Sequence, residues 1–422
     1  MLQVAFIRQN KEEVLKRLAV KHFTDTDLVA EVLELDDRRK HLKSSLDEVQ
    51  AAINTLSKEF KTLMGQGKTA ELETKKAEAA ALKNKIGPLQ QSLDQAEATL
   101  SEQLLKLPNL PHASVPEGKT PEDNVVVRQG GPEAHLPGKA LPHWDLARKY
   151  DLIDLDLGVK LTGSGFPVYK HQGARLERAL IALFLDYNTQ AGYTEYLPPL
   201  MVNEATAYGT GQLPDKEAQM YHVTQDGFYL IPTAEVPLTN IYRGEIIKPE
   251  ALPVKMTAYT PCFRREAGSY GKDVRGLNRV HQFDKVEIVQ LVRADTSYQV
   301  LEEMVLHVEK LLQLLELPYR ILQLCGGDMG FTSALTYDFE VFSAAQKRWL
   351  EVSSVSNFES FQTNRMKIRT KEGGKTELLH SLNGSSLALP RILACLLENH
   401  QQAEGIALPE SLHRYFGGDH IG

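Results

Sequence analysis

Two apolar seams in the first hundred residues constrain the fold of this chain more than any other feature. Apolar side chains recur in alternating steps of three and four over 32–63, with Arg39 in one apolar slot, and again over 72–100. This spacing is typical of helices that pack along a heptad seam. A glycine-containing break at 64–69 separates the seams, so we predict an antiparallel helical hairpin of about 50 Å, at about 1.5 Å per residue.

The residues of this hairpin leave its role open. A spacer or a dimerisation coiled coil has the same pattern. Lysines and arginines are mixed with acidic residues over 38–85, and several lysines gather near the turn. They could neutralise the phosphates of a nucleic acid held along the hairpin, but a solvated helix face accounts for them equally well. Gly87 and Pro88 lie within the second seam, where they should kink or interrupt the helix.

Composition limits the class of protein. A chain of 422 residues with ample apolar content predicts two domains. Its formal net charge of −7 argues against nucleic-acid binding through the whole surface, although a local basic patch remains compatible. The three cysteines lie far apart without CxxC spacing, so neither a disulfide framework nor a zinc site is expected. Because no run of about 18 apolar residues occurs, we predict a cytoplasmic protein that does not enter a membrane.

The chain changes character after the hairpin. Prolines at 108, 111 and 116 stop the helix and predict a linker over about 107–125. Beyond it, short strand-like segments often follow one another without an intervening helix. Helical patterns stand at 174–189, 297–317 and 391–401. This order predicts an α+β fold with a mainly antiparallel sheet and helices packed on one side.

The stretch 262–287, CFRREAGSYGKDVRGLNRVHQFDKVE, combines charge and glycine between apolar ends. Glycine relaxes the steric limits on a loop, and arginine offers a planar fork to phosphate or carboxylate. Two strands joined by a cationic loop would have this composition, and so would a solvated surface hairpin. TAE at 233–235, EVSS at 351–354 and NGSSLALPR at 383–391 add hydroxyl and charged residues beside apolar segments. Without a Walker loop or a dinucleotide fingerprint, these segments favour a phosphate-handling site built from side chains.

These segments resemble the motifs of one family. Residues 263–287 are similar to motif 2, and residues 382–399 to motif 3, of class II aminoacyl-tRNA synthetases in the form found in seryl-tRNA synthetases. LPPLMVN at 197–203 resembles motif 1, where family members form a homodimer. The long helical arm is also a mark of this family. The resemblance therefore implies a tRNA-binding domain over 1–106 and a class II catalytic domain over 107–422.

The resemblance also implies an activity. The chain would activate L-serine with ATP to seryl-adenylate and transfer the seryl group to the 3′ end of tRNA(Ser), and also of tRNA(Sec) where the host has one. Arg264 would bridge the α-phosphate and the serine carboxylate, Glu266 would hold the adenine amino group, and Arg391 would hold the distal phosphates. The resemblance implies these three as the catalytic residues, with the two arginines supplying the preorganised cations that charge on the phosphate oxygens needs. The expected ATP site comprises Arg264, Arg265, Glu266, Phe283, Glu351, Val352, Ser353, Ser354 and Arg391, with Phe283 stacked on the adenine.

The serine site implied by the resemblance is equally specific. It comprises Thr233, Ala234, Glu235, Arg264, Glu287, Asn383 and Ser385. A site that pairs a hydroxyl rejects alanine strongly, because its own polar groups would be left unsatisfied. Glu351 and Ser354 stand at the spacing that the family uses for magnesium bound through ATP, a site of oxygen ligands.

The catalytic segments depart from the family pattern at three places. Asn278 stands where an apolar residue is usual, Val355 stands where a cysteine is common, and FQTNRM at 361–366 replaces a more usual arginine pair. All residues assigned to ATP or serine are nevertheless present. Two alternatives from other classes remain: a non-catalytic tRNA-binding relative, and a ligase that loads an amino acid onto a carrier protein. The second class lacks the long arm, so the arm argues against it.

Overall fold

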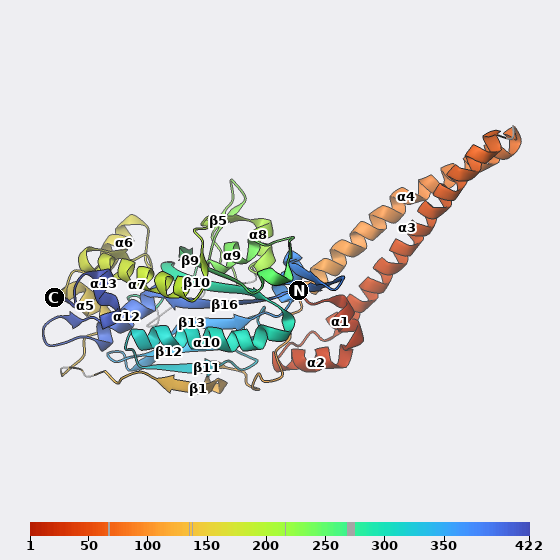
Figure 1. Cartoon of the computed structure of the whole chain (residues 1–422). Coiled ribbons are helices and arrows are strands. Elements are labelled where there is room, and N and C mark those ends of the chain that lie inside the picture. The colour runs from red at the N-terminus through yellow and green to blue at the C-terminus, as the bar shows by residue number, and fades with distance from the viewer. Residues whose placement is uncertain (66–67, 135, 137, 216, 268–274) are drawn as a thin grey trace. The chain divides into compact units, whose positions relative to one another are not determined.

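A computed structural model describes residues 1–422 apart from 66–67, 135, 137, 216 and 268–274. The chain forms two compact units, coloured from red at the N-terminus to blue at the C-terminus in Figure 1. One unit comprises Met1–Ala19 and Phe23–Pro108, and the other comprises Val20–His22 and Asn109–Gly422. Across the described part of the chain, no helix has the length and apolar character needed to span a membrane.

Helices form the regular structure described in the first unit. Short helices α1 (Val4–Gln9) and α2 (Lys11–Val20) precede two long ones, α3 (Asp27–Gly65) and α4 (Thr69–Leu104). Figure 1 shows α3 and α4 packed side by side. The least exposed apolar seam residues are Val32, Ile53, Leu56, Ala79, Leu93, Ala96 and Leu100. The predicted helical hairpin is confirmed, although part of its turn lies outside the described residues.

Arg39, the polar residue in the first seam, has a buried acidic partner. Asp36 is 3% exposed and forms ion pairs with Arg39 (2.8 Å), with Lys40 (2.7 Å) and with Arg8 of α1 (2.9 Å). Burial alone would raise the pKa of Asp36, but hydrogen bonds from these three cations outweigh it and lower the pKa to about 2. The gap in the seam is therefore an ion-paired junction between α1 and α3.

Gly87 and Pro88 do not interrupt the helix, because α4 is one helix from Thr69 to Leu104; a kink there, the other outcome expected, stays a prediction. Proline lacks an N–H group, so one carbonyl of the preceding turn loses its helical partner. Both residues are exposed. Water can hydrate that carbonyl, and the helix therefore continues past the proline.

An eight-stranded sheet organises the described part of the second unit (Figure 1). Its order is β1–β11–β12–β13–β16–β10–β9–β4, and only the short β4 pairs in parallel, with β9. The strands are β1 (Val125–Gly130), β4 (Thr194–Glu195), β9 (Val254–Phe263), β10 (Gln282–Val292), β11 (Tyr319–Gln323), β12 (Leu335–Ser343), β13 (Arg348–Asn357) and β16 (His380–Ala388). The prediction of a mainly antiparallel sheet is confirmed.

Asn109, within the segment expected to be a linker, is packed into the second unit. Its side chain is buried and donates hydrogen bonds to the carbonyl oxygens of Thr332 (2.9 Å) and Phe358 (2.8 Å). The boundary between the two compact units accordingly falls at Pro108.

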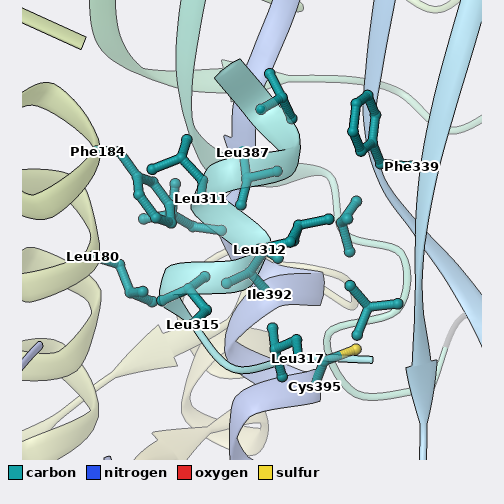
Figure 2. Close-up of a cluster of buried hydrophobic side chains, with 14 of the residues drawn as sticks. Leu180, Phe184, Leu311, Leu312, Leu315, Leu317, Phe339, Leu387, Ile392 and Cys395 are labelled. Carbon is teal, nitrogen blue, oxygen red and sulfur yellow. The ribbon is translucent and has the colours of Figure 1, made fainter. Parts of the chain in front are cut away.

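The main core of the second unit lies between the sheet and three helices. These are α7 (His171–Gln190), α10 (Ser297–Leu314) and α12 (Leu389–Asn399). Figure 2 shows part of this core, with Phe184 of α7, Leu312 of α10 and Ile392 of α12. Burying one such side chain contributes about 1.5–3 kcal/mol relative to leaving it exposed. The core thus gives the sheet a rigid support.

Strand β10 shows that the opposite face of the sheet is partly covered as well. Val286 and Ile288 point into the main core, and because side chains alternate along a strand, Glu287 and Leu291 lie on the other face. There Leu291 packs with α9 (Glu235–Asn240) in a second apolar cluster. The expectation of helices on one side only is thereby corrected, and the free part of this second face carries polar residues.

Candidate active site

A cavity of about 1090 Å³ lies on the polar face of the sheet. Alternation along β10 directs Phe283, Lys285 and Glu287 into it. The other predicted residues that line the cavity are Thr233, Glu235, Arg264, Glu266, Glu351, Val352, Ser353, Ser354, Asn383, Ser385 and Arg391. The fold therefore brings together segments that are spread over more than 150 residues of the chain.

Two predicted residues, Arg265 and Ala234, are not part of this lining. Arg265 is exposed, and its backbone N–H donates to the carbonyl of Gln219 over 2.8 Å. Ala234 is fully buried in the apolar cluster that contains Leu238. Their assignment to the ATP and serine sites stays a prediction.

Glu287 is the centre of a buried polar group at one end of the cavity. Thr233 Oγ1 donates to Glu287 Oε2 over 2.9 Å, and the backbone N–H of Glu235 donates to Thr233 Oγ1 over 3.2 Å. Ser385 stands directly opposite Glu287 in the β10–β16 ladder. Lys285 Nζ lies 2.5 Å from Glu287 Oε2, and both side chains are under 10% exposed. Because a buried carboxylate needs a compensating charge, Lys285, which sequence analysis did not assign, belongs to the site.

Glu235 is the second buried carboxyl at this end. Gln362 Nε2 donates to Glu235 Oε1 over 2.6 Å, and Gln362 Oε1 accepts from Ser381 Oγ over 2.7 Å. Burial, followed by the nearby Glu287 carboxylate, raises the pKa of Glu235 to about 7. Gln362 comes from α11 (Phe361–Met366), the segment that departs from the family pattern. The segment EVSSVSNFESFQ at 351–362, which ends at Gln362, also resembles an active-site segment of the family, but Gln362 itself was not assigned.

Arg264 and Phe283 lie beside each other farther along the cavity. The guanidinium carbon of Arg264 is 5.2 Å from the ring centre of Phe283, and Arg264 Nε donates to the carbonyl of Pro232 over 3.3 Å. Glu266 has a φ of 49° and forms an ion pair with Arg279. A cation next to an aromatic face suits a ligand that carries both a phosphate and a flat base.

Arg391 is fixed by backbone carbonyls. Its Nε donates to the carbonyl of Asn278 over 2.9 Å, and its Nη1 donates to the carbonyl of Glu351 over 2.7 Å. Nη1 also lies 3.6 Å from the Glu351 carboxylate. The guanidinium is therefore oriented before any ligand binds, as a preorganised cation should be.

Asp338 is a third oxygen-bearing side chain near Ser354 and Glu351. Ser354 Oγ donates to Asp338 Oδ1 over 2.5 Å across the β12–β13 pair. Burial, followed by the neighbouring Glu351, raises the pKa of Asp338 well above its ordinary range. Magnesium suits such residues, because it binds one or two carboxylates and takes its other ligands from phosphates and water. No group of three or more His, Cys, Asp or Glu side chains within the described ranges is arranged to hold a metal ion.

The basic loop 272–279 is a candidate contact for the acceptor end of the tRNA, and it begins within 268–274, which lies outside the described residues. In its described part, the Arg275 guanidinium lies 4.4 Å from a ring centre of Trp144, and Arg279 lines the cavity. The position of this loop relative to tRNA stays a prediction.

Sheet and cavity together define a class II aminoacyl-tRNA synthetase. Residues 221–400 match the family described as tRNA synthetase class II core domain (G, H, P, S and T), and residues 1–111 match the seryl-tRNA synthetase N-terminal domain. The chain is 50% identical to the serine–tRNA ligase of Salinibacter ruber, covering 100% of this chain and 99% of the relative. It is 48% identical to that of Neisseria gonorrhoeae, over 99% and 98% of the two chains. The chain belongs to the seryl-tRNA synthetase family.

Solved structures agree with this assignment. The seryl-tRNA synthetase of Pyrococcus horikoshii, crystallised with ATP, superposes with a TM-score of 0.92 at 31% identity, and the match covers 100% of this chain and 99% of that one. The cytoplasmic serine–tRNA ligase of Naegleria fowleri, crystallised with AMP, gives a TM-score of 0.87 at 27% identity over 100% and 98%.

Proposed function

We propose that the chain is a serine–tRNA ligase that forms seryl-adenylate from L-serine and ATP and transfers the seryl group to the 3′ end of tRNA(Ser). The observation that carries this proposal is the buried Thr233–Glu287–Glu235 group, which shares one cavity with Arg264 and Phe283. Full-length relatives at 50% and 48% identity are named serine–tRNA ligases.

Serine recognition follows from this buried group. Glu287 and Glu235 would bind the ammonium, whose charge compensates the two carboxylates. Thr233 and Ser385 stand beside Glu287 and would pair the serine hydroxyl. Alanine offers no hydroxyl, so the site's buried polar groups would stay unsatisfied, at a cost of about 1–3 kcal/mol each. Arg264 would bind the serine carboxylate and orient it toward the α-phosphorus.

Adenylate formation then needs orientation and charge stabilisation. The serine carboxylate oxygen attacks the α-phosphorus, the bond to the bridging oxygen breaks, and pyrophosphate leaves. Phe283 would stack on the adenine and Glu266 would accept from its amino group, while Arg264 and Arg391 would stabilise charge on the phosphates. Because Arg391 is already held by two carbonyls, little reorganisation is required when ATP binds.

Magnesium would bind through ATP at Glu351 and Ser354, with Asp338 beside them. When bound, the ion supplies positive charge to the triphosphate. The neighbouring Glu351 carboxylate is, after burial, one cause of the raised pKa of Asp338. We assign no zinc to this protein.

The arm would carry the tRNA. Its helices expose lysines that are paired with acidic neighbours, such as Lys75 of α4 with Glu59 of α3 at 3.2 Å. These residues could contact the phosphates of a long nucleic acid, and a solvated helix face would have the same composition. The crystal structure of Aquifex aeolicus tRNA(Sec) with the Methanopyrus kandleri enzyme has a TM-score of 0.59 at 19% identity, which supports the fold alone. We propose tRNA(Ser) as the substrate, and tRNA(Sec) where the host contains it.

We also propose a homodimer that works in the cytoplasm. The segment that resembles motif 1 exposes two apolar side chains, Leu197 (87% exposed) and Met201 (51%). Exposure of this kind in a segment that includes a strand, β5 (Met201–Asn203), is typical of an interface. Sedimentation of the purified chain tests the dimer.

Exchange of labelled pyrophosphate into ATP tests the catalytic proposal. Exchange that requires L-serine, with alanine and threonine far less effective, is the expected result. If properly folded protein shows no serine-dependent exchange, the chain is a non-catalytic relative. If exchange occurs but the seryl group goes to a carrier protein and not to tRNA(Ser), the acceptor has been assigned wrongly.

A further inference from the structure

A buried histidine lies beneath the C-terminal end of the motif 2 loop. His143 is the first residue of α5 (His143–Lys149) and is 1% exposed. Its Nδ1 lies 2.7 Å from Glu398 Oε1, and its Nε2 lies 2.9 Å from the backbone nitrogen of Leu277. Neither His143 nor Glu398 lines the cavity, but Leu277 does. The pair therefore acts on the site through the loop.

The hydrogen-bond directions determine which nitrogen of His143 carries the proton. A backbone N–H can only donate, so Nε2 must accept from Leu277 and is unprotonated. The proton is therefore on Nδ1 and is donated to Glu398 Oε1. A second proton on His143 would occupy Nε2 and remove the only acceptor that the described structure gives to Leu277 N–H.

Glu398 links this histidine to the helix that carries Arg391. Glu398 and Arg391 both belong to α12, and Glu398 is fully buried. Besides His143 Nδ1, its carboxylate accepts from the backbone N–H of His143 (2.9 Å), from Gln346 Nε2 (3.0 Å) and from Ser343 Oγ. With these donors, Glu398 can remain ionised inside the core.

Asn278 connects the same network to the phosphate-binding end of the cavity. Its side-chain nitrogen donates to Gln346 Oε1 over 2.9 Å, and its carbonyl accepts from Arg391 Nε over 2.9 Å. Asn278 is also the residue that departs from the family pattern. The side-chain amide of Asn278 forms a hydrogen bond with Gln346, and an apolar side chain at this position could not form it.

The loop and α5 approach each other too closely for a side chain at position 276. Gly276 has a φ of +66°, and a Cβ atom there would lie 2.2 Å from His143 Nε2. Next to it, the Arg275 guanidinium lies 4.4 Å from a ring centre of Trp144, the residue after His143. Consecutive residues of α5 thus hold consecutive parts of the loop.

We infer that the His143–Glu398 pair is a positioning site for ATP, which holds Leu277 and Asn278 of the motif 2 loop against α12 so that Arg391 faces the phosphates. This inference rests on the proposed function. The two can fail separately, because serine-dependent exchange by the wild type tests the function and the variants below test the positioning site.

The test compares the KM for ATP and the KM for serine in pyrophosphate exchange. In His143→Gln, the amide cannot occupy both ring-nitrogen positions, so the contacts to Glu398 and Leu277 cannot both form and the KM for ATP should rise about tenfold, with the KM for serine little changed. Gln346→Ala removes the hydrogen-bond partner of the Asn278 side chain without altering a residue of the core. It should give a smaller rise in the KM for ATP. His420→Gln is the matched control, because His420 is exposed and pairs with Asp419 (2.8 Å).

Two results would overturn the inference. One is a KM for ATP in His143→Gln that matches that of His420→Gln. The other is an equal rise in the KM values for ATP and serine, which would indicate a structural defect alone. If His143→Gln does not fold, Gln346→Ala decides: an unchanged KM for ATP in that variant would refute the positioning role.

Discussion

The arm and the cavity use charged residues in opposite ways. On the arm, Lys43 and Asp47 lie 2.9 Å apart with more than half of each side chain exposed. In the cavity, Lys285 and Glu287 lie 2.5 Å apart with almost no exposure. An exposed pair contributes about 0.2–1 kcal/mol, whereas removing one partner of a buried pair costs about 3–5 kcal/mol. Apolar spacing therefore determines the structure of the arm, and buried charge determines the chemistry of the cavity.

Shortening the arm should distinguish the function of the arm from that of the cavity most clearly. If residues 46–93 are replaced by a short glycine-rich turn, charging of tRNA(Ser) should fall by about a thousandfold, because many phosphate contacts are lost together. Serine-dependent pyrophosphate exchange serves as the internal control and should persist. Equal charging by the shortened and the full-length proteins would contradict the role assigned to the arm.

Arg264→Ala should have the largest effect of any single substitution in the cavity. Removing a preorganised cation from the reacting phosphate is expected to lower kcat/KM for exchange by about a hundredfold to a thousandfold. Arg265→Ala is the matched comparison, since this neighbouring arginine is exposed and does not line the cavity. Similar losses in both variants would show that the geometry of the cavity misidentifies the functional arginine.

Thr233→Val tests whether the buried hydroxyl network recognises serine. Valine has a similar shape but cannot donate to Glu287, so kcat/KM for serine should fall about tenfold to a hundredfold. On the arm, Thr55 is exposed and its hydroxyl donates to the carbonyl of Ala51. Thr55→Val should leave exchange unchanged, and a serine preference retained by Thr233→Val would argue against the network.

The raised pKa of Glu235, about 7, predicts that serine binding depends on pH. Below this pKa the carboxyl is protonated in the empty site and cannot pair with the serine ammonium. Serine affinity, measured by calorimetry without ATP, should therefore strengthen several-fold, up to about tenfold per pH unit, as the pH rises toward 7. Glu235→Gln should bind serine weakly at every pH, and an unaltered dependence in that variant would assign the titration to another group.

Lys43→Ala should produce the smallest change. Its partner Asp47 is exposed, so the free energy of unfolding should fall by no more than about 0.5 kcal/mol. Chemical denaturation of the full chain measures this difference. A loss several times larger would mean that ion pairs on the arm contribute more than exposed pairs normally do.

The two regions also differ in how far the sequence predicts them. The arm follows from local spacing, because each helix turn repeats the same apolar positions; the error at Pro88 arose because exposure of that turn cannot be read from spacing. The antiparallel sheet was also predicted, and most of the residues assigned to the site through resemblance to known motifs line the cavity.

Lys285, Gln362 and Asp338 were not predicted, for a common physical reason. Gln362 and Asp338 acquire their roles from partners distant in the sequence or on another strand: Glu235 for Gln362, and Ser354 for Asp338. Lys285 stands two residues from Glu287, but their pairing matters only because the fold removes both from water. Local pattern carries no information about such burial.

The alternation along β10 also limits how this strand can evolve. Odd-numbered positions from 283 to 287 face the ligand cavity, while even-numbered positions from 286 face the apolar core. Insertion or deletion of one residue would exchange these sets, burying charge in the core and exposing apolar side chains to the substrate. Substrate preference can therefore drift by substitution at odd positions, but the length of the strand should be far less tolerant of change.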